Sequence, residues 1–183
     1  MKKIFATLIL LLFYGIVLSQ DLKTTVDYLN DRIKDVVDGS IITYTDGTKY
    51  KFKYRGNLFG FSEEKKLAYY SKLLRDPNDN NGWAYLDYSF TFKPAQITEI
   101  KNEEDIAPAS GIGYLEIYFE GKTAVRTFKD YKGIIYNKYE ETIDYLDKIQ
   151  IAYVKADPTA FERIKKAFLN LKKLAVDKDP FAN

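Results

Sequence analysis

The chain has 183 residues, of which 46% are hydrophobic and 16% aromatic, and it contains neither histidine nor cysteine. Their absence excludes disulfides, thiol chemistry, the serine and cysteine catalytic triads and nearly every zinc or copper site. The formal net charge of +2 is small, which argues against a protein whose main role is to grip nucleic acid.

The first 19 residues have the pattern of a secretory signal peptide. Met1-Lys2-Lys3 forms a positively charged start, residues 4–18 are an almost unbroken apolar run, and Ser19 ends a small-residue cleavage site. The apolar run is shorter than the about 20 residues of a membrane-spanning helix. We therefore expect cleavage before Gln20, export to the periplasm or the medium, and no transmembrane anchor in the mature protein.

The mature chain is predicted to be one domain, residues 20–183. A chain of this size buries roughly 70% of its unfolded surface, which is enough for one hydrophobic core. Lys2 and Lys3 are the only charged residues of the signal, so the mature chain has equal numbers of acidic and basic side chains. Any anion-binding site must therefore be local.

In the N-terminal part of the domain, the spacing of apolar residues changes near residue 40 from a helical to a strand-like period. Residues 21–37 place apolar side chains at alternating three- and four-residue steps, which predicts an amphipathic helix. A hairpin follows at 40–55, since Asp46-Gly47 is a preferred pair for a two-residue turn. That turn would place Thr43 opposite Tyr50, with Ile41 on the same, buried face.

The middle of the chain reads mainly as strands. Residues 62–74 are ambiguous between a helix that starts at Ser62 and a strand. Residues 85–93 alternate as a strand with Leu86, Tyr88, Phe90 and Phe92 inward, and a short strand is expected at 97–100.

A second hairpin is predicted from residues 114–120 and 123–128, joined at Gly121. Its acidic residues Glu116 and Glu120 would lie beside the lysines of the first hairpin. We expect an irregular loop with a turn of helix at 129–146.

The end of the domain is predicted as a last strand and a helix. The strand covers 148–154. The helix is predicted to be amphipathic, with Asp157 as its cap, Pro158 at its first position and apolar residues at three- and four-residue steps from Phe161 to Ala175. The fold class that results is α+β, an antiparallel sheet or sandwich with an N-terminal and a C-terminal amphipathic helix.

The stretch KYKFKYR alternates basic and aromatic residues and has two interpretations. It is either a ligand platform for an anion or glycan, or a half-buried strand whose rings fill the core while lysine stems cover its wet face. Strand period alone explains the alternation, which favours the second interpretation. The candidate ligand-binding residues in it are Lys49, Lys51, Lys53 and Arg55.

Two further candidates lie near the loop DPNDNNG. Asp76, Asn78 and Asn80 place oxygen ligands at alternate positions, as calcium loops do, but a glycine is missing at the sixth position. A solvated connection is the alternative, and we expect no other cofactor. Trp83 and Tyr85 could stack on a sugar ring or close one end of the core.

The C-terminal helix carries a set of cations that could meet an acidic partner. A solvated helix face is the competing interpretation. The cations are Arg163, Lys165, Lys166, Lys172 and Lys173.

The ending KADPTAFERIKKAFLNLKKLA after the strand DKIQIAYVK resembles that of pleckstrin-homology-like (PH-like) sandwiches and of uncharacterised exported bacterial proteins. The resemblance implies a C-terminal helix that plugs one end of two packed sheets. Lys49 and Lys53-Tyr54-Arg55 imitate the inositol phosphate motif of some members, but here every basic residue follows the turn. An exported bacterial protein would seldom meet phosphoinositides, so the resemblance implies a binding scaffold and not that ligand.

These observations favour an exported, non-catalytic binding or interaction domain of unknown ligand, whose partner is a protein or a glycan and not nucleic acid. The alternative is a carboxylate-dependent glycan hydrolase, or a glycan-binding protein related to one, since two acidic side chains suffice for that chemistry. Sequence spacing does not identify such a pair.

Overall fold

The computed structural model describes residues 21–36, 40–44, 47, 49–75, 85–103, 106–108, 111–131 and 139–176. The signal segment, Trp83 and the candidate calcium ligands Asp76, Asn78 and Asn80 lie outside these residues. No side-chain description covers residues 40–46, 48–55, 75, 85 and 104–108.

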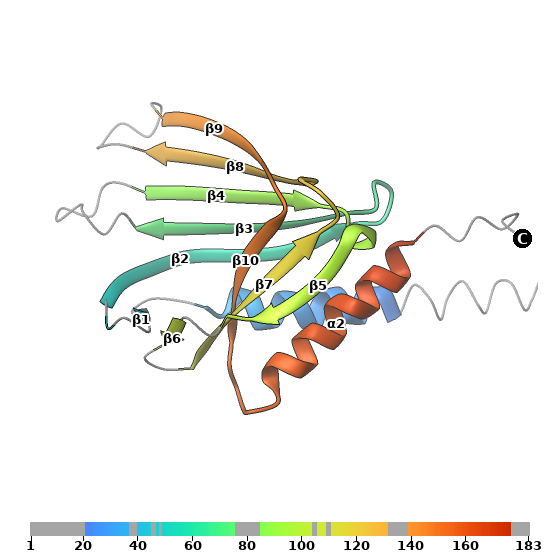
Figure 1. Cartoon of the computed structure of the whole chain (residues 1–183), viewed down its shortest axis with the longest axis horizontal. Helices are drawn as coiled ribbons and strands as arrows, with labels where there is room; N and C mark the ends of the chain where they lie inside the picture. Colours follow the sequence, from blue (N-terminus) through green and yellow to red (C-terminus); the bar gives the residue numbers. More distant parts are fainter. Residues whose placement is uncertain are drawn as a thin grey trace, which may run out of the picture.

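The described chain consists of a helix followed by strands and a second helix (Figure 1). The first helix covers 21–34. The strands are β1 (Ser40–Tyr44), β2 (Lys49–Ser62), β3 (Leu67–Arg75), β4 (Tyr85–Phe92), β5 (Ile97–Asn102), β6 (Ile106–Pro108), β7 (Ile112–Phe119), β8 (Ala124–Tyr131), β9 (Tyr139–Leu146) and β10 (Lys148–Val154). A 3-10 turn, η1 (Pro94–Gln96), precedes β5, and α2 (Ala160–Ala175) ends the fold.

The strands form two antiparallel sheets. The larger has seven strands in the order β6-β1-β2-β3-β4-β8-β9, and the smaller has three in the order β10-β7-β5. The fold is therefore α+β and consistent with a sandwich, as the sequence predicts.

Buried side chains from both sheets and both helices form one main core. Alternation along the strands places their apolar residues inward, and the two helices contribute one apolar side each. The largest fully buried side chains are Tyr70, Tyr153, Phe92, Phe168, Leu29, Ile33, Ile97, Leu115, Ile117, Ile151, Ile164 and Leu171.

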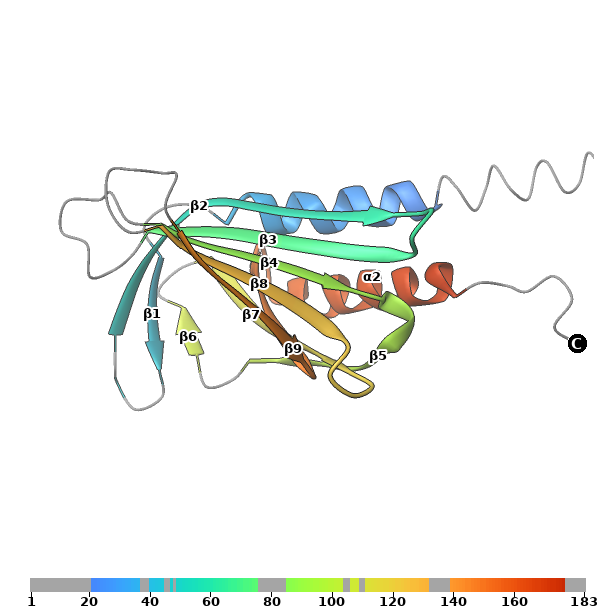
Figure 2. The same cartoon turned by 90° about the horizontal axis from the view of Figure 1, so that it is seen from above.

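The two helices lie side by side and pack against the sheets (Figures 1 and 2). The first helix runs along β2, where the side-chain oxygen of Asn30 accepts a hydrogen bond from the backbone N–H of Phe59 at 3.1 Å. α2 lies beside β5, and its Lys172 ammonium donates to the carbonyl of Ile97 at 2.6 Å. These contacts hold both helices against the sheets.

The first hairpin exists, but its predicted register is wrong by one residue. Ile42 pairs with Tyr50 and Thr43 with Lys49, so the paired residues enclose an odd number of residues, whereas a two-residue turn encloses an even number. Gly47 has a φ of 85°, a left-handed conformation that glycine adopts without steric cost. An αL glycine is typical of three-residue hairpin loops.

The second predicted hairpin is wrong because β7 and β8 belong to different sheets. β7 pairs with β5 and β10, whereas β8 pairs with β4 and β9. The chain crosses from one sheet to the other after Phe119, whose N–H bonds to the carbonyl of Asp147 at 2.8 Å. Two strand patterns and a glycine turn look the same in sequence whether the strands pair or separate.

The crossing also changes the predicted charge pairing. Glu116 lies on the smaller sheet, where its carboxylate accepts a hydrogen bond from the Lys148 ammonium at 2.7 Å. The lysines of the first hairpin belong to β2 in the larger sheet. The predicted neighbourhood of Glu116 with that lysine stripe is therefore wrong.

Two other segments were ambiguous or misleading in sequence. Residues 67–75 form β3, so the strand interpretation of the segment that begins at Ser62 is correct. The loop predicted at 129–146 is wrong, because β8 continues to Tyr131 and β9 occupies 139–146. The acidic residues of β9 hide its strand pattern, and cross-strand pairs such as Arg126 with Asp144 compensate them.

Candidate functional site

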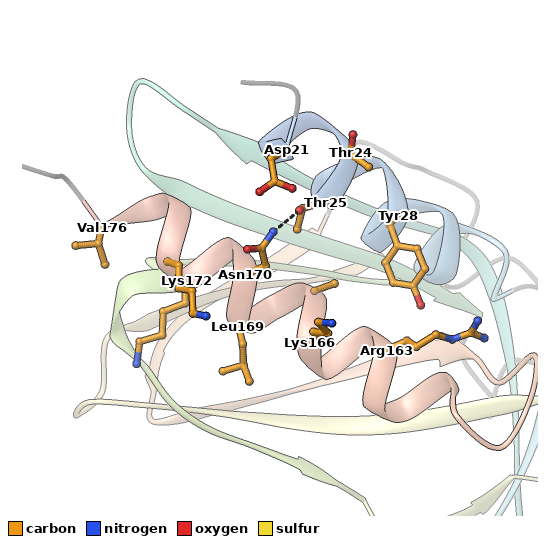
Figure 3. A pocket seen from close by; sticks show the side chains of 12 residues that line it. Asp21, Thr24, Thr25, Tyr28, Arg163, Lys166, Leu169, Asn170, Lys172 and Val176 are labelled. Carbon is orange, nitrogen blue, oxygen red and sulfur yellow. Dashed lines mark hydrogen bonds between the residues drawn. The ribbon is translucent and has the colours of Figure 1, made fainter. Parts of the chain in front are cut away.

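A groove lies between the two helices of the described structure (Figure 3). It has a volume of about 810 Å³, within the range of protein ligand sites. Asp21 and Val176 lie at one end and Tyr28 and Arg163 at the other, so the two helices run antiparallel. The described residues that line it are Asp21, Thr24, Thr25, Tyr28, Arg163, Lys166, Ala167, Leu169, Asn170, Lys172, Lys173 and Val176.

Helical periodicity explains which residues face the groove. On α2, the buried side chains of Ile164, Phe168 and Leu171 point to the core. Lys166 and Lys173 are seven residues apart and lie on a neighbouring stripe that borders the groove. The same helix therefore buries one face in the core and turns another to the groove.

One hydrogen bond joins the two walls. The side-chain amide of Asn170 donates to the hydroxyl of Thr25 at 2.9 Å, and Thr25 is buried. The bond satisfies a buried hydroxyl that would otherwise be costly. It also sets the separation of the helices at this point (Figure 3).

The α2 wall is strongly basic, and two of its cations are unpaired. Arg163 forms an ion pair with Asp157, and Lys172 donates to a backbone carbonyl. Within the described part of the chain, Lys166 and Lys173 take part in no ion pair. Of the described lining residues only Asp21 is acidic, so the groove has an excess of positive charge.

Exposed apolar side chains stand between these cations. Leu169 is 40% exposed and Val176 is 50% exposed, although both are large hydrophobic residues. On the opposite wall the ring of Tyr28 lies 5.5 Å from the guanidinium carbon of Arg32. The groove therefore offers apolar contact area bordered by cations.

The lysines predicted as a platform lie on β2, but the regular pairing of this strand is interrupted at Arg55. The β2–β3 register shifts between Tyr54 and Gly56, so Arg55 is the extra residue of a bulge. Lys53 pairs with Arg75, which in turn pairs with Tyr85. The structure therefore brings Lys53 and Tyr85 to one row of the sheet, while their side chains and Trp83 lie outside the described residues.

Four of the five predicted α2 cations line the groove. The exception is Lys165, whose ammonium lies 5.6 Å from the ring centre of Phe161. The sequence therefore contained part of the signal, the basic face of α2. The sequence contained no signal for the opposite wall, because the packing of residues 21–28 beside α2 depends on the whole fold.

Two properties of the described residues bear on membranes and metals. Among the described residues, neither helix combines the length and the apolar composition needed to cross a bilayer. The same residues contain no group of three or more acidic side chains placed to hold a metal ion. The candidate calcium loop at 76–80 is not among them, so calcium binding there stays a prediction.

Comparisons with known proteins returned no relative. No family model matches the chain, and no curated protein or solved structure matches it. The resemblance to PH-like sandwiches therefore stays a prediction, and the geometry of the groove is the basis for assigning a function.

Proposed function

We propose that the chain is an exported, non-catalytic binding domain whose groove takes an acidic amphipathic helix of a partner protein. The observation that carries the proposal is the pair of cations Lys166 and Lys173, which border an apolar groove without a counter-ion among the described residues. A basic groove with an apolar floor complements a helix that is acidic on one side and apolar on the next.

The length of the groove fits a helix of about four turns. Its α2 wall runs from Arg163 to Val176, about 20 Å at the rise of 1.5 Å per residue. Lys166 and Lys173 are two helical turns apart, about 10 Å. A partner helix with two acidic residues seven positions apart would meet both cations and place an apolar residue against Leu169.

The charge of the groove supports binding over hydrolysis. Glycoside hydrolysis ordinarily needs two carboxyl groups on either side of the scissile bond. Among the described lining residues, Asp21 is the single acidic one. The glycan hydrolase alternative therefore receives no support from the groove.

Two finer features of architecture and location belong to the same proposal. The buried stripe of α2 beside its exposed lysines supports an amphipathic C-terminal helix, and its position against two sheets supports a PH-like arrangement. The charged start and apolar run of residues 1–18 support export. N-terminal sequencing of the mature protein should begin at Gln20.

The groove can be tested with a synthetic peptide of about 14 residues that carries two glutamates seven positions apart and leucines between them. We expect the double variant K166E/K173E to bind it at least about tenfold more weakly than the wild type. Two rim ion pairs contribute roughly 0.2–1 kcal/mol each, and reversal adds repulsion. Fluorescence anisotropy at low and high salt would measure the loss.

The matched control is K65E/K122E, which changes the net charge equally at two exposed lysines on turns far from α2 in sequence. Its affinity for the peptide should equal that of the wild type. A peptide with glutamine in place of glutamate should bind both proteins weakly. Equal losses in the two double variants, or equal binding of the two peptides, would contradict the proposal.

A further inference from the structure

A ladder of aromatic rings crosses the inner face of the larger sheet. Tyr70 on β3 stacks on Phe90 of β4 with ring centres 5.7 Å apart, and Tyr88 of β4 stacks on Phe128 of β8 at 4.7 Å. Tyr88 and Phe90 are themselves nearly parallel, with centres 6.4 Å apart. Tyr70 and Phe90 are buried, whereas Tyr88 and Phe128 are half-buried, so the ladder runs from the core to the solvent.

Two cations flank the accessible end of this ladder. The Lys72 ammonium lies 5.2 Å from the ring centre of Tyr88 and 5.8 Å from that of Phe90. Arg126 belongs to β8, and in the pairing of β4 with β8 it lies opposite Phe90. Lys72 therefore contacts the rings from β3, and Arg126 lies opposite Phe90 on β8, the strand on the other side of β4.

The charges at this place are not balanced. Arg126 donates to Asp144 from Nη2 and, at 3.1 Å, from Nε, which leaves Nη1 unused. Lys72 has ring contacts but no ion pair with any described residue. Burial, with the repulsion by Arg126 as a second cause, lowers the pKa of Lys72 to about 8. A cation held mainly by ring faces gains strongly from an added anion.

We propose that this end of the ladder binds a small carboxylate with an aromatic ring. The ligand carboxylate accepts hydrogen bonds from the Lys72 ammonium and from Nη1 of Arg126, and its ring packs against the edges of Tyr88 and Phe128, whose faces already stack on each other. Both donors and both rings are half-buried, so each keeps some contact with solvent. The site lies on the inner sheet face and is independent of the groove between the helices.

The test uses benzoate as the probe, with benzamide as its neutral isostere and acetate as a carboxylate without a ring. Titration by NMR at pH 7 should show benzoate binding at least tenfold more tightly than either control. The variant K72M keeps the length and removes the charge, and it should weaken benzoate at least tenfold. The exposed lysine variant K122M is the matched control and should bind as the wild type does.

A second readout does not depend on any variant. In the wild type, the pKa of Lys72 followed by NMR of its ε-carbon should rise by at least one unit when benzoate is saturating. The affinity for benzoate should fall as the pH is raised through the pKa of Lys72. Equal affinity for benzoate and benzamide, or a Lys72 pKa that benzoate leaves unchanged, would overturn the proposal.

Discussion

At the scale of single residues, two glycines hold tyrosine rings against the backbone of a neighbouring strand. A Cβ added to Gly113 would lie 2.3 Å from Cζ of Tyr153, and one added to Gly60 would lie 2.1 Å from Cζ of Tyr69. Both distances are far below van der Waals contact, so in each case the ring must move. What distinguishes the two sites is where the ring can go.

We expect Gly113→Ala to destabilise the fold more than Gly60→Ala. Tyr153 is 2% exposed and packed in the core, so its ring has no free space, whereas Tyr69 is 44% exposed and can swing into solvent. Overpacking of a core typically costs about 1–3 kcal/mol, and an exposed adjustment costs less. Urea unfolding of both variants measures the difference, and equal losses would contradict this explanation.

Individual inward positions were predictable from the sequence wherever a strand alternates. Leu115, Ile117 and Phe119 are buried as predicted, because strand period alone decides their side of the sheet. The environment of Lys72 was not predictable, since its neighbours Tyr88 and Arg126 come from other strands. The neighbours of such a charged side chain are set by the register between strands, and the sequence alone does not reveal that register.

At the scale of elements, Asp157 organises the start of α2. Its carboxylate accepts hydrogen bonds from the Thr159 backbone N–H at 2.8 Å and from the Thr159 hydroxyl at 2.7 Å, and it pairs with Arg163. These hydrogen bonds from Thr159, with the charge of Arg163, hold the pKa of Asp157 below its usual value. The ionised form is therefore the one that stabilises the folded helix.

We expect Asp157→Ala to lower the melting temperature at pH 7, and Asp157→Asn to lower it less, because the amide keeps one acceptor oxygen. Since the folded pKa is depressed, the carboxylate stabilises the fold fully above its unfolded pKa of about 4. That stabilisation is lost as the pH falls through the folded pKa. The difference in melting temperature between wild type and Asp157→Ala should close near pH 2. A difference that does not change with pH would contradict a stabilising role of the ionised carboxylate.

Elements with regular local signals were predicted well, and elements defined by distant pairing were not. The C-terminal helix and β10 follow from periodicity, but the predicted helix start is two residues early: α2 begins at Ala160 with Thr159 as its N-cap, not at Pro158 with Asp157 as the cap. β9 was missed because Tyr139, Ile143 and Leu146 recur at a helical spacing, while its ladder with β8 decides the outcome. Tertiary pairing overrides local propensity in such segments.

At the scale of the whole molecule, Phe168 connects the last helix to the larger sheet. It is fully buried, and its ring meets that of Phe59 edge-on with centres 5.4 Å apart. The neighbouring Leu169 points to the groove and is 40% exposed. Adjacent residues of α2 therefore serve the stability of the fold and the proposed binding separately.

We expect Phe168→Ala to cost about 3–5 kcal/mol of unfolding free energy, as truncation of buried aromatic residues does. Leu169→Ala should change stability by less than about 0.5 kcal/mol, yet weaken binding of the acidic peptide. Chemical denaturation and anisotropy on both variants separate the two effects. Loss of stability in Leu169→Ala would show that the groove is part of the core.

The sequence indicated the fold class and the basic wall of the groove, but not the division of strands between sheets. Residues 120–123 carry the same turn signal whether they close a hairpin or join two sheets. The row that aligns Lys53, Arg75 and Tyr85 likewise appears only with the register. These features depend on contacts between residues far apart in the chain.

The hydrogen bond between Thr25 and Asn170 joins residues 145 positions apart. During synthesis, the wall that carries Thr25 therefore leaves the ribosome well before the wall that carries Asn170. Until α2 arrives, the aromatic residues it covers stay open to chaperones and to other unfinished chains. A chain stopped before residue 160 would therefore expose these aromatic residues and lack one wall of the groove, so the proposed binding surface forms only after α2 has been synthesised.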